Sequence, residues 1–476
     1  MALLWQALSF PELPLDVFRR GGGDDLLLAV VDARKLLTVS RSAMACGIRP
    51  GMRPAQARSL CPGLQLHDRR SDLEQDSLRR LADGLLQFSG WVSRQPPNEL
   101  LVEIGGSLRL FGGLGDFRRQ LERHMAALGL QWRDAVATTP GAACLLGRIG
   151  DSRPVIDEQR LAERLSPLPI DVLELTTARR QALEGLGLRT LGDCLRLPRG
   201  DLGRRLGNDL VTQLERALGE RPDPRPAHRP RPVFRGEQPL PAPAHDSSAV
   251  LFGLQRLLRE LEGLLCSLQS GVQRVRLQLQ HTSRPATVLV LGLQGPGRDA
   301  QRLLAVARER LERTPLQAPV IGLVLEARQL VPLAAQPEDL LDQGRVGQLP
   351  WQQLAERLRA RLGPDAVSGL KTAPDHRPER AWQPGAPETR ATRLASPRRP
   401  LWLLPEPVPL RCRGGNPEHR GVLTLCHGPE RIESGWWDGQ DVRRDYYEAL
   451  DGHGARLWIF RDHRQPDRWF LHGYFA

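Results

Sequence analysis

The sequence predicts an α+β protein of several domains, and three observations support this prediction. A chain of 476 residues is too long for one compact core and suggests three or four units. Residues 1–165 and 236–345 each alternate apolar strands with amphipathic helices, which is typical of sheets covered by helices. Residues 166–222 contain short helices only, and the 40 Pro and 46 Gly indicate long linkers between units.

The first sheet domain contains an inserted lobe. A strand at residues 2–9 is expected to stop at Pro11, because proline interrupts strand pairing. The pattern then predicts a strand, a helix ending at Gly47, a helix over 53–60, a strand at 64–66, a helix over 73–92, a strand within 100–113, a helix over 114–128, a strand at 134–139 and a helix over 141–150.

The predicted strand "LLVEIGGSLRLFGG" at residues 100–113 contains two adjacent glycines, Gly105 and Gly106. Glycine weakens the interior of a strand because it loses the most backbone entropy and packs no side chain. A pair of glycines there needs a reason.

The helical segment that follows contains a Gly-Leu-Gly hairpin at Gly185 and Gly187, with a second helix starting at Thr190. Backbone N–H groups beside a helix N-terminus suit a phosphate oxygen, so these residues and Arg189 are candidate DNA contacts. An ordinary helix–helix turn explains the same pattern equally well. The segment "RPDPRPAHRPRP" after it is a basic, proline-stiffened linker.

The next unit, residues 246–326, is predicted to contain a helix, two strands, a helix over 299–311 and a strand at 320–327. In "VQRVRLQLQ", Arg274 and Arg276 share one face, and apolar residues share the other. The two arginines could lie along a nucleic-acid backbone. They could equally keep an exposed face soluble.

The charge of the chain favours a polyanionic partner such as DNA. Lys and Arg number 67 against 55 acidic residues, which gives a net charge of +12 and a pI near 10.3. Lys35 and Lys371 are the only lysines, and arginine binds phosphate through a planar fork. A GC-rich genome would explain the choice of arginine but not the net excess.

No cofactor, metal site, disulfide framework or membrane contact is expected. The seven cysteines show no metal-ligand spacing, and their odd number fits a reducing compartment. The N-terminus has no basic region before its short apolar run, and no window reaches the roughly 18 apolar residues of a membrane span. We therefore expect a cytoplasmic protein.

Beyond residue 345, proline interrupts most patterns. A helix is predicted over 351–362, and residues 371–400 lack the apolar content to fold alone. Aromatic residues concentrate in the tail, which is typical of a protein-binding surface, although a small all-β core would explain them too. The candidate partner-binding residues are Trp402, Trp436, Trp437, Tyr446, Tyr447, Trp458, Trp469 and Phe470.

The order of units resembles the Y-family of translesion DNA polymerases. The most specific match is "SRSAMACGIRPGMRPAQARSLCPGLQL", which is similar to the family's fingers pattern of a helix ending in Gly, then G-M-x-x-x-x-A and a Cys-Pro turn. The resemblance implies a right-hand fold with a palm (1–10 and 71–165), fingers (11–70), a helix-hairpin-helix thumb (166–222), a linker (223–235), a little finger (236–345), a clamp-motif region and flexible linker (346–400) and a C-terminal partner-binding region (401–476).

Active members of this family use three carboxylates to hold two metal ions across the incoming triphosphate. An Asp-x-Asp lies in the first strand and an Asp-Glu pair lies in a later palm strand. In this chain the resemblance places Ala7 and Ser9 at the first pair and Gly105 and Gly106 at the second. We therefore predict a vestigial site without catalytic residues, in which the glycine pair marks two lost acids.

Other parts of the nucleotide site also differ from the family. Arg41 and Met44 occupy fingers positions where the family uses Tyr and Arg on the triphosphate. Glu103 lies on the same predicted strand face as Gly105, roughly 7 Å away at about 3.4 Å per residue. One displaced carboxylate cannot hold two divalent ions about 4 Å apart. We predict that the chain has no polymerase activity.

The tail segments "RPLWLLPEP", "GPERIESGWWDG", "DVRRDYY" and "WFLHGYFA" resemble the C-terminal region of catalytically silent Y-family members from bacterial mutagenesis cassettes. The resemblance runs essentially end to end. It implies a scaffold in SOS-type error-prone DNA synthesis that binds DNA, the sliding clamp, a RecA-like partner and a separate error-prone DnaE-type polymerase.

The clamp contact is expected in an extended segment resembling Gln-Leu-x-Leu-Phe. In "GQLPWQQL", Gln348, Leu349 and Trp351 are the candidate residues, although Pro350 and Trp351 replace the Leu-Phe pair. The alternative is a helix start with Pro350 in its first turn.

Two other functions remain open at this point. One is an active translesion polymerase with an atypical metal site. The other is a protein-binding adaptor that no longer contacts DNA.

Overall fold

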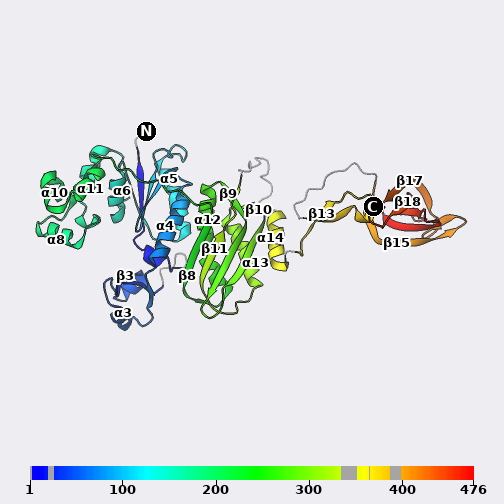
Figure 1. Cartoon of the computed structure of the whole chain (residues 1–476), viewed down its shortest axis with the longest axis horizontal. Helices are drawn as coiled ribbons and strands as arrows, with labels where there is room; N and C mark the ends of the chain where they lie inside the picture. The colour runs from blue at the N-terminus through cyan, green and yellow to red at the C-terminus, as the bar shows by residue number, and fades with distance from the viewer. Residues whose placement is uncertain (1–2, 20–25, 334–350, 364, 386–397, 476) are drawn as a thin grey trace. The chain divides into compact units, whose positions relative to one another are not determined.

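A computed structural model of the chain describes residues 3–19, 26–333, 351–363, 365–385 and 398–475. The chain forms two compact units, Met1–Arg361 and Leu362–Ala476 (Figure 1). Both helices and sheets occur in the first unit, and the second is built mainly from strands, so the predicted α+β multidomain class is confirmed. No helix of the described residues is long and apolar enough to cross a membrane.

The palm is a four-stranded antiparallel sheet with the strand order β5-β6-β1-β7. Its elements are β1 (Trp5–Ser9), α4 (Ser71–Leu85), β5 (Val92–Gln95), β6 (Glu99–Glu103), α5 (Leu114–Leu128), β7 (Arg133–Ala137) and α6 (Pro140–Ile149). Alternate residues of β1 face opposite sides of this sheet. Leu8 packs in the core formed with α4 and α5, whereas Ala7 packs in the core formed with α6.

The fingers lobe is a small sheet of order β3-β2-β4 with short helices. Its elements are α1 (Leu13–Asp16), β2 (Leu28–Asp32), β3 (Lys35–Val39), α2 (Arg41–Ala45), α3 (Pro54–Leu60) and β4 (Gln65–Asp68). The Ser40 hydroxyl accepts the Ala43 N–H, which caps α2.

The thumb is entirely helical, as predicted. It contains η1 (Glu158–Arg160), α7 (Leu161–Leu165), η2 (Ile170–Val172), α8 (Thr177–Gly185), α9 (Leu191–Arg196), α10 (Arg199–Leu206) and α11 (Asn208–Leu218). Its apolar residues join those of α6 and the palm sheet in one core.

The little finger is an antiparallel sheet of order β10-β9-β11-β8, with β12 paired to β9. Its elements are β8 (Phe234–Ala244), α12 (Ser247–Ser267), β9 (Ser270–His281), β10 (Thr287–Gly297), α13 (Ala300–Glu312), β11 (Val320–Ala327) and β12 (Val331–Pro332). The helix α14 (Trp351–Leu362) follows, and its buried Glu356 accepts hydrogen bonds from Arg302 Nε at 2.8 Å and from the Gln294 N–H at 2.7 Å.

The second unit contains a six-stranded antiparallel sheet of order β16-β15-β20-β19-β18-β17. Its elements are β13 (Gly369–Thr372), η3 (Pro378–Arg380), β14 (Trp382–Gly385), β15 (Trp402–Arg413), β16 (Asn416–Glu418), β17 (Thr424–Ser434), β18 (Val442–Leu450), β19 (Arg456–Asp462) and β20 (Gln465–Tyr474).

Two expectations about local structure were wrong. The helix predicted over 73–92 ends at Leu85, and Val92 begins β5 instead. Part of the segment expected to stay unfolded, residues 369–385, forms a hairpin and a helical turn in the second unit. This segment is ordered by polar contacts with the six-stranded sheet, which composition alone does not reveal.

Helices α4 and α12 join the palm to the little finger. Their backbones approach closely at Gly84 and Gly263. A Cβ added to Gly263 would lie only 3.0 Å from the Gly84 Cα. A buried ion-pair network lies along the same contact. Glu260 accepts hydrogen bonds from Arg80 Nε at 2.6 Å and from Arg256 Nε at 3.2 Å, and all three side chains are nearly inaccessible to solvent.

The network extends into the fingers lobe. Arg256 Nη1 donates to the Asp16 carbonyl at 2.6 Å, and Nη2 donates to the Ser77 hydroxyl at 3.2 Å. Burial raises the pKa of Glu260, but the charges of Arg80 and Arg256 offset this, so the net pKa is lowered and the carboxylate stays ionised.

We predict that Glu260→Ala strongly destabilises the chain, because two buried guanidinium groups would lose their counter-ion. The free energy of unfolding should fall by about 3–5 kcal/mol in urea denaturation. Glu163→Ala is the control, since Glu163 pairs with Arg160 in solvent and should cost less than about 1 kcal/mol. Equal effects of the two substitutions would contradict the importance of the buried network.

Candidate functional site

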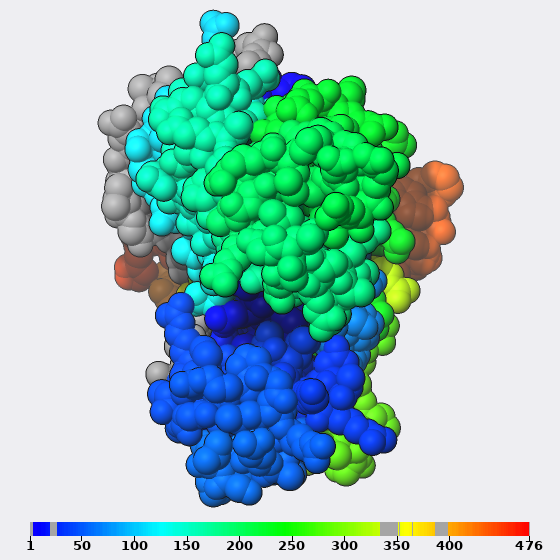
Figure 2. Space-filling model, turned by 90° about the vertical axis from the view of Figure 1, so that its left-hand side faces the viewer, coloured from blue at the N-terminus to red at the C-terminus, as the bar shows by residue number. Residues whose placement is uncertain are grey.

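Figure 2 shows a hollow between the blue fingers lobe and the green thumb helices, with N-terminal residues at its floor. The fingers lobe is rich in positive charge. Residues 27–69 contain seven Lys and Arg but only two Asp and Glu. Of the predicted vestigial metal positions, Ala7 and Ser9 lie in the palm sheet, and Gly105 and Gly106 follow its strand β6.

Ala7 and Ser9 lie on β1, as predicted, and both are buried. Ala7 is 2% exposed, and a Cβ added to Gly147 of α6 would lie 3.3 Å from the Ala7 Cβ. Helix α6 therefore packs directly on position 7. A carboxylate at this position would enter an apolar core instead of a solvated cleft.

Gly105 and Gly106 do not lie inside a strand, which corrects the sequence-based prediction. Strand β6 ends at Glu103, and the glycines begin the turn that follows. The Glu103 carboxylate accepts the Gly105 N–H at 2.8 Å and the Gly106 N–H at 3.4 Å. The Glu103 carboxylate is therefore already hydrogen-bonded to the turn that follows its strand.

The sheet register also separates the two pairs of predicted positions. Ala7 lies opposite Leu101, whereas the Gly105 N–H points to the Leu4 carbonyl at 3.4 Å. Gly105 and Gly106 are therefore not the register partners of Ala7 and Ser9. That these four positions are the remains of one metal site stays a prediction.

One acidic residue beside this part of β1 is Glu99, which pairs with Ser9 across the sheet, while Asp134 of β7 lies opposite Leu8. The Glu99 side chain is buried, and Arg148 of α6 binds it through two hydrogen bonds, Nε to Oε1 at 2.7 Å and Nη2 to Oε2 at 3.0 Å. The same guanidinium also contacts the Val172 carbonyl and Glu174.

Arg148 supplies a permanent positive charge to Glu99. Burial lowers the pKa of Arg148, but the hydrogen bonds and charge of Glu99 raise it, and the net pKa lies above its ordinary value. Sequence analysis missed this pair because its members are 49 residues apart. Among the residues that the structure describes, no group of three or more His, Cys, Asp or Glu could hold a metal ion.

The thumb hairpin does not offer the free N–H groups that were predicted. Thr190 caps α9, and the Asp193 carboxylate accepts the N–H groups of Arg189 at 3.0 Å and Thr190 at 2.9 Å. The Gly187 N–H donates to the Glu184 carbonyl at 2.9 Å. These backbone N–H groups are therefore already hydrogen-bonded within the chain.

The two hairpin glycines play different structural roles. Gly187 has φ +75°, a conformation that favours glycine, while Gly185 belongs to the last turn of α8. A Cβ at either position would meet nothing within 4 Å. The conformation of the hairpin, and not a close approach by another backbone, explains Gly187.

Arg274 and Arg276 lie on the outer face of β9, and Val275, Leu277 and Leu279 are buried beneath it. This confirms the predicted division of the two faces. The described residues include no ion pair to either arginine, so both guanidinium groups project from the sheet unneutralised.

Of the clamp candidates, Gln348 and Leu349 lie outside the described residues. Trp351 is the first residue of α14 and is 57% exposed. Pro350, which the alternative places in the first turn of a helix, also lies outside the described residues.

The tail aromatics divide into two groups. Tyr446, Trp458 and Trp469 are buried in the cores of the six-stranded sheet, and Tyr447 and Phe470 pack against these cores. A small all-β core therefore accounts for these five residues. Three indoles remain exposed: Trp402, Trp436 and Trp437.

The fold and the site together define the class of protein. The chain has a Y-family polymerase-like right hand of palm, fingers, thumb and little finger, followed by a β-rich C-terminal unit. A family profile described as "IMS: impB/mucB/samB family" matches residues 24–148.

Comparison with individual proteins is more specific. The chain is 28% identical over 468 residues to Protein ImuB of Caulobacter vibrioides, which covers 90% of this chain and 100% of that protein. It is also 29% identical over 198 residues to DNA polymerase IV 2 of Mesorhizobium japonicum, covering 40% of this chain and 46% of that one. The match to Protein ImuB covers most of the chain, as the end-to-end resemblance predicted.

Solved structures of Y-family polymerases also match. DinB from Sulfolobus solfataricus covers 70% of this chain and 100% of its own, at 14% identity and a TM-score of 0.38. The insertion ternary complex of Dbh DNA polymerase also covers 70%, at 15% identity and a TM-score of 0.39.

We predict that Ala7→Asp destabilises the chain by about 3 kcal/mol or more, because the carboxylate would be forced against α6 without a partner. Leu110→Asp, at an 83% exposed position, should change the free energy of unfolding by less than about 0.5 kcal/mol. Denaturant unfolding measures both. A stable Ala7→Asp variant that binds Mn²⁺ would contradict the packing described at position 7.

Proposed function

We propose that the chain is a non-catalytic, DNA-binding scaffold in SOS-type error-prone translesion DNA synthesis. The similarity to ImuB supports a role related to translesion synthesis. The finer proposal is that the chain links DNA, the sliding clamp, a RecA-like partner called ImuA and an error-prone DnaE-type polymerase in the cytoplasm.

The Glu99–Arg148 ion pair is the observation that carries the non-catalytic part of this proposal. Two-metal phosphoryl transfer needs several carboxylate oxygens around each ion. Here the buried acid beside β1 is neutralised by an arginine, and position 7 is filled by core packing. A divalent ion would have to displace a bound guanidinium that also holds Glu174.

The charge distribution supports DNA binding by the first unit. Residues 362–476 hold 17 Lys and Arg against 15 Asp and Glu, a net charge of +2, so +10 of the chain's +12 lies in residues 1–361. The outward-facing Arg274 and Arg276 and the basic fingers lobe are the proposed contacts to phosphate. Because Asp193 takes the thumb N–H groups, the hairpin would contribute chiefly through the Arg189 side chain.

Partner binding by the tail and clamp binding by Gln348, Leu349 and Trp351 remain proposals. The exposed indoles of the second unit support the first, and the exposure of Trp351 at the start of α14 supports the second. Because the second compact unit begins at Leu362, we propose residues 362–476 as the partner-binding unit, a wider range than the predicted 401–476.

An active Y-family polymerase is the second candidate function, favoured by the family match at residues 24–148. We predict that the purified chain adds no nucleotide to a primer–template with Mg²⁺ or Mn²⁺. Glu99→Gln and Glu103→Gln form a matched pair for this assay. Primer extension that Glu99→Gln abolishes and Glu103→Gln spares would establish catalysis and overturn the proposal.

We predict that the chain binds primer–template DNA with a steep salt dependence, because each neutralised phosphate releases counter-ions. Replacing both Arg274 and Arg276 by Glu should weaken binding at least tenfold and reduce the salt slope by about 2. Fluorescence anisotropy measures both quantities, and Arg468→Glu in the second unit is the control. Unchanged DNA binding after the double replacement would favour an adaptor that does not use this face.

A further inference from the structure

The loop between β17 and β18, residues 435–441, carries two neighbouring exposed tryptophans. Trp436 is 80% exposed and Trp437 is 57% exposed, and their rings meet edge to face with centroids 5.6 Å apart. Burying one such side chain would gain about 2–3 kcal/mol. The loop therefore leaves two large aromatic side chains in solvent, without the free energy that their burial would provide.

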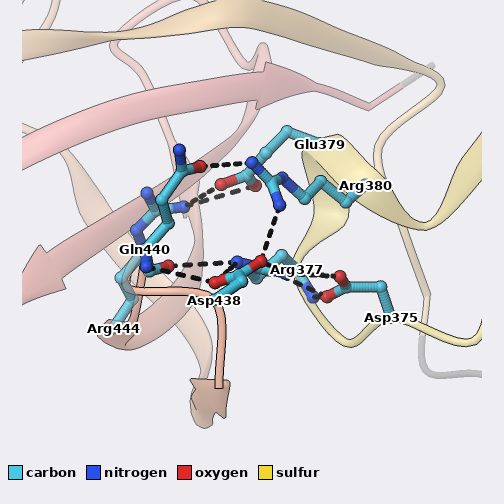
Figure 3. Close-up of polar contacts among 7 residues, drawn as sticks. All are labelled: Asp375, Arg377, Glu379, Arg380, Asp438, Gln440 and Arg444. Carbon is cyan, nitrogen blue, oxygen red and sulfur yellow. Dashed lines mark hydrogen bonds and ion pairs between the residues drawn. The ribbon is translucent and has the colours of Figure 1, made fainter. Parts of the chain in front are cut away.

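A buried arginine from outside the sheet holds this loop in place (Figure 3). Arg377, which is 2% exposed, donates from Nη1 and Nη2 to the two carboxylate oxygens of Asp438 at 3.0 and 2.7 Å. Nη1 also donates to the Gln440 carbonyl at 3.1 Å. On its other side the same guanidinium binds Asp375 at 2.7–3.2 Å. One group thus fixes both the side chain and the backbone of the loop.

The residue at the start of the loop has to be glycine because of this arginine. A Cβ on Gly435 would lie 2.5 Å from Arg377 Nη1 and 2.5 Å from the Gln440 carbonyl oxygen. Gly435 also has φ +89°, where a side chain would be strained. The loop sequence and the buried arginine therefore fit each other.

Further polar contacts stabilise the loop and the segment that carries Arg377. Arg380 Nη1 donates to Asp438 at 2.8 Å and its other terminal nitrogen binds the Gln440 side chain, while Arg444 Nη1 donates to Glu379 at 3.1 Å (Figure 3). The Arg377 side chain lowers the pKa of Asp438 to about 2, so the carboxylate stays charged throughout the neutral range. These contacts order the loop before any partner arrives.

Ordering in advance has a direct consequence for binding. Association normally loses free energy when a loop and its side chains become fixed, and a pre-ordered loop avoids most of that loss. Tryptophan is the residue most enriched among the anchors of protein interfaces. A fixed loop that presents two indoles has the properties of such an anchor.

The charge of the second unit distinguishes between a protein and a nucleic acid as the partner of the two indoles. Exposed indoles can also stack on single-stranded DNA, but such sites combine them with a strongly positive groove. Residues 362–476 carry a net charge of only +2, and Arg377, Arg380 and Arg444 are committed to carboxylates. The chemistry around the indoles favours an apolar pocket on a protein.

We propose that Trp436 and Trp437 are the anchor of the second unit for a partner protein, and that the Arg377–Asp438 pair positions them for insertion into an apolar pocket on that partner. This inference rests on the proposed scaffold function and reduces its eight candidate tail aromatics to two. Trp402, the other exposed candidate, is not held by this network.

The test compares Trp436→Ala/Trp437→Ala with Trp402→Ala in the full chain. The probes are the two proposed protein partners, the purified RecA-like protein and the purified DnaE-type polymerase, and a dT oligonucleotide. Both indoles are exposed, so the double variant should keep the circular dichroism spectrum of the wild type. Surface plasmon resonance should show at least a hundredfold weaker capture of one partner by the double variant, with Trp402→Ala within threefold of wild type.

Each other result would overturn the inference in a distinguishable way. Equal capture by the wild type and the double variant would overturn the anchor and leave the scaffold function standing. Quenching of indole fluorescence by dT, lost in the double variant, would assign the loop to nucleic acid. Failure of the wild type to capture either protein would overturn both the anchor and the scaffold function.

Arg377→Gln tests the positioning role separately. This variant keeps both indoles but removes the bidentate contact to Asp438, so capture should fall about tenfold while Trp436 and Trp437 become more mobile in NMR relaxation of the indole N–H groups. Unchanged capture together with unchanged indole mobility would show that Arg377 does not position the loop.

Discussion

Glu99 and Arg148 join the palm sheet to the helix that covers it, and this contact limits what the palm can do. A carboxylate buried beside β1 needs a cation, and the chain supplies one as a guanidinium with two hydrogen bonds. Because Arg148 also reaches Val172 and Glu174 at the base of the thumb, the same group connects palm and thumb. The carboxylate of Glu99 is thus used for structure.

The buried Arg80–Glu260–Arg256 network likewise uses a carboxylate neutralised by arginine to join structural elements, here the palm and the little finger. Replacing a buried ion pair by apolar residues is often neutral or stabilising, so such networks are better explained by specificity than by stability. In this chain the network fixes α12 on α4 at a point where glycine lets the backbones meet. Palm and little finger are thereby held in one arrangement.

Sequence periodicity predicted many elements well. The bounds of α5, α14 and β11 agree with the expected helices and strand, because each has a clear apolar pattern and a proline or glycine at an end. The two faces of β9 were also predicted, since alternation along a strand is a local property. Ala7 and Ser9 were placed correctly on the first strand.

What the sequence could not show were contacts between distant residues. The register of β1 against β6 decides which acid lies near Ser9, and no local pattern encodes it. The capture of two thumb N–H groups by Asp193 depends on a side-chain rotamer in the next helix. Aromatic residues have the same composition in a core and in an interface, so only burial separated Trp458 from Trp436.

The central proposal is that the palm binds no catalytic metal ions and that its buried Glu99 serves an internal ion pair with Arg148. Titration of the full chain with Mn²⁺, in the presence of primer–template and a nucleoside triphosphate and followed by electron paramagnetic resonance, tests this claim most directly. The account predicts no protein-specific Mn²⁺ beyond that bound by the nucleotide and DNA. Two tightly bound ions that disappear in Glu99→Gln would contradict it.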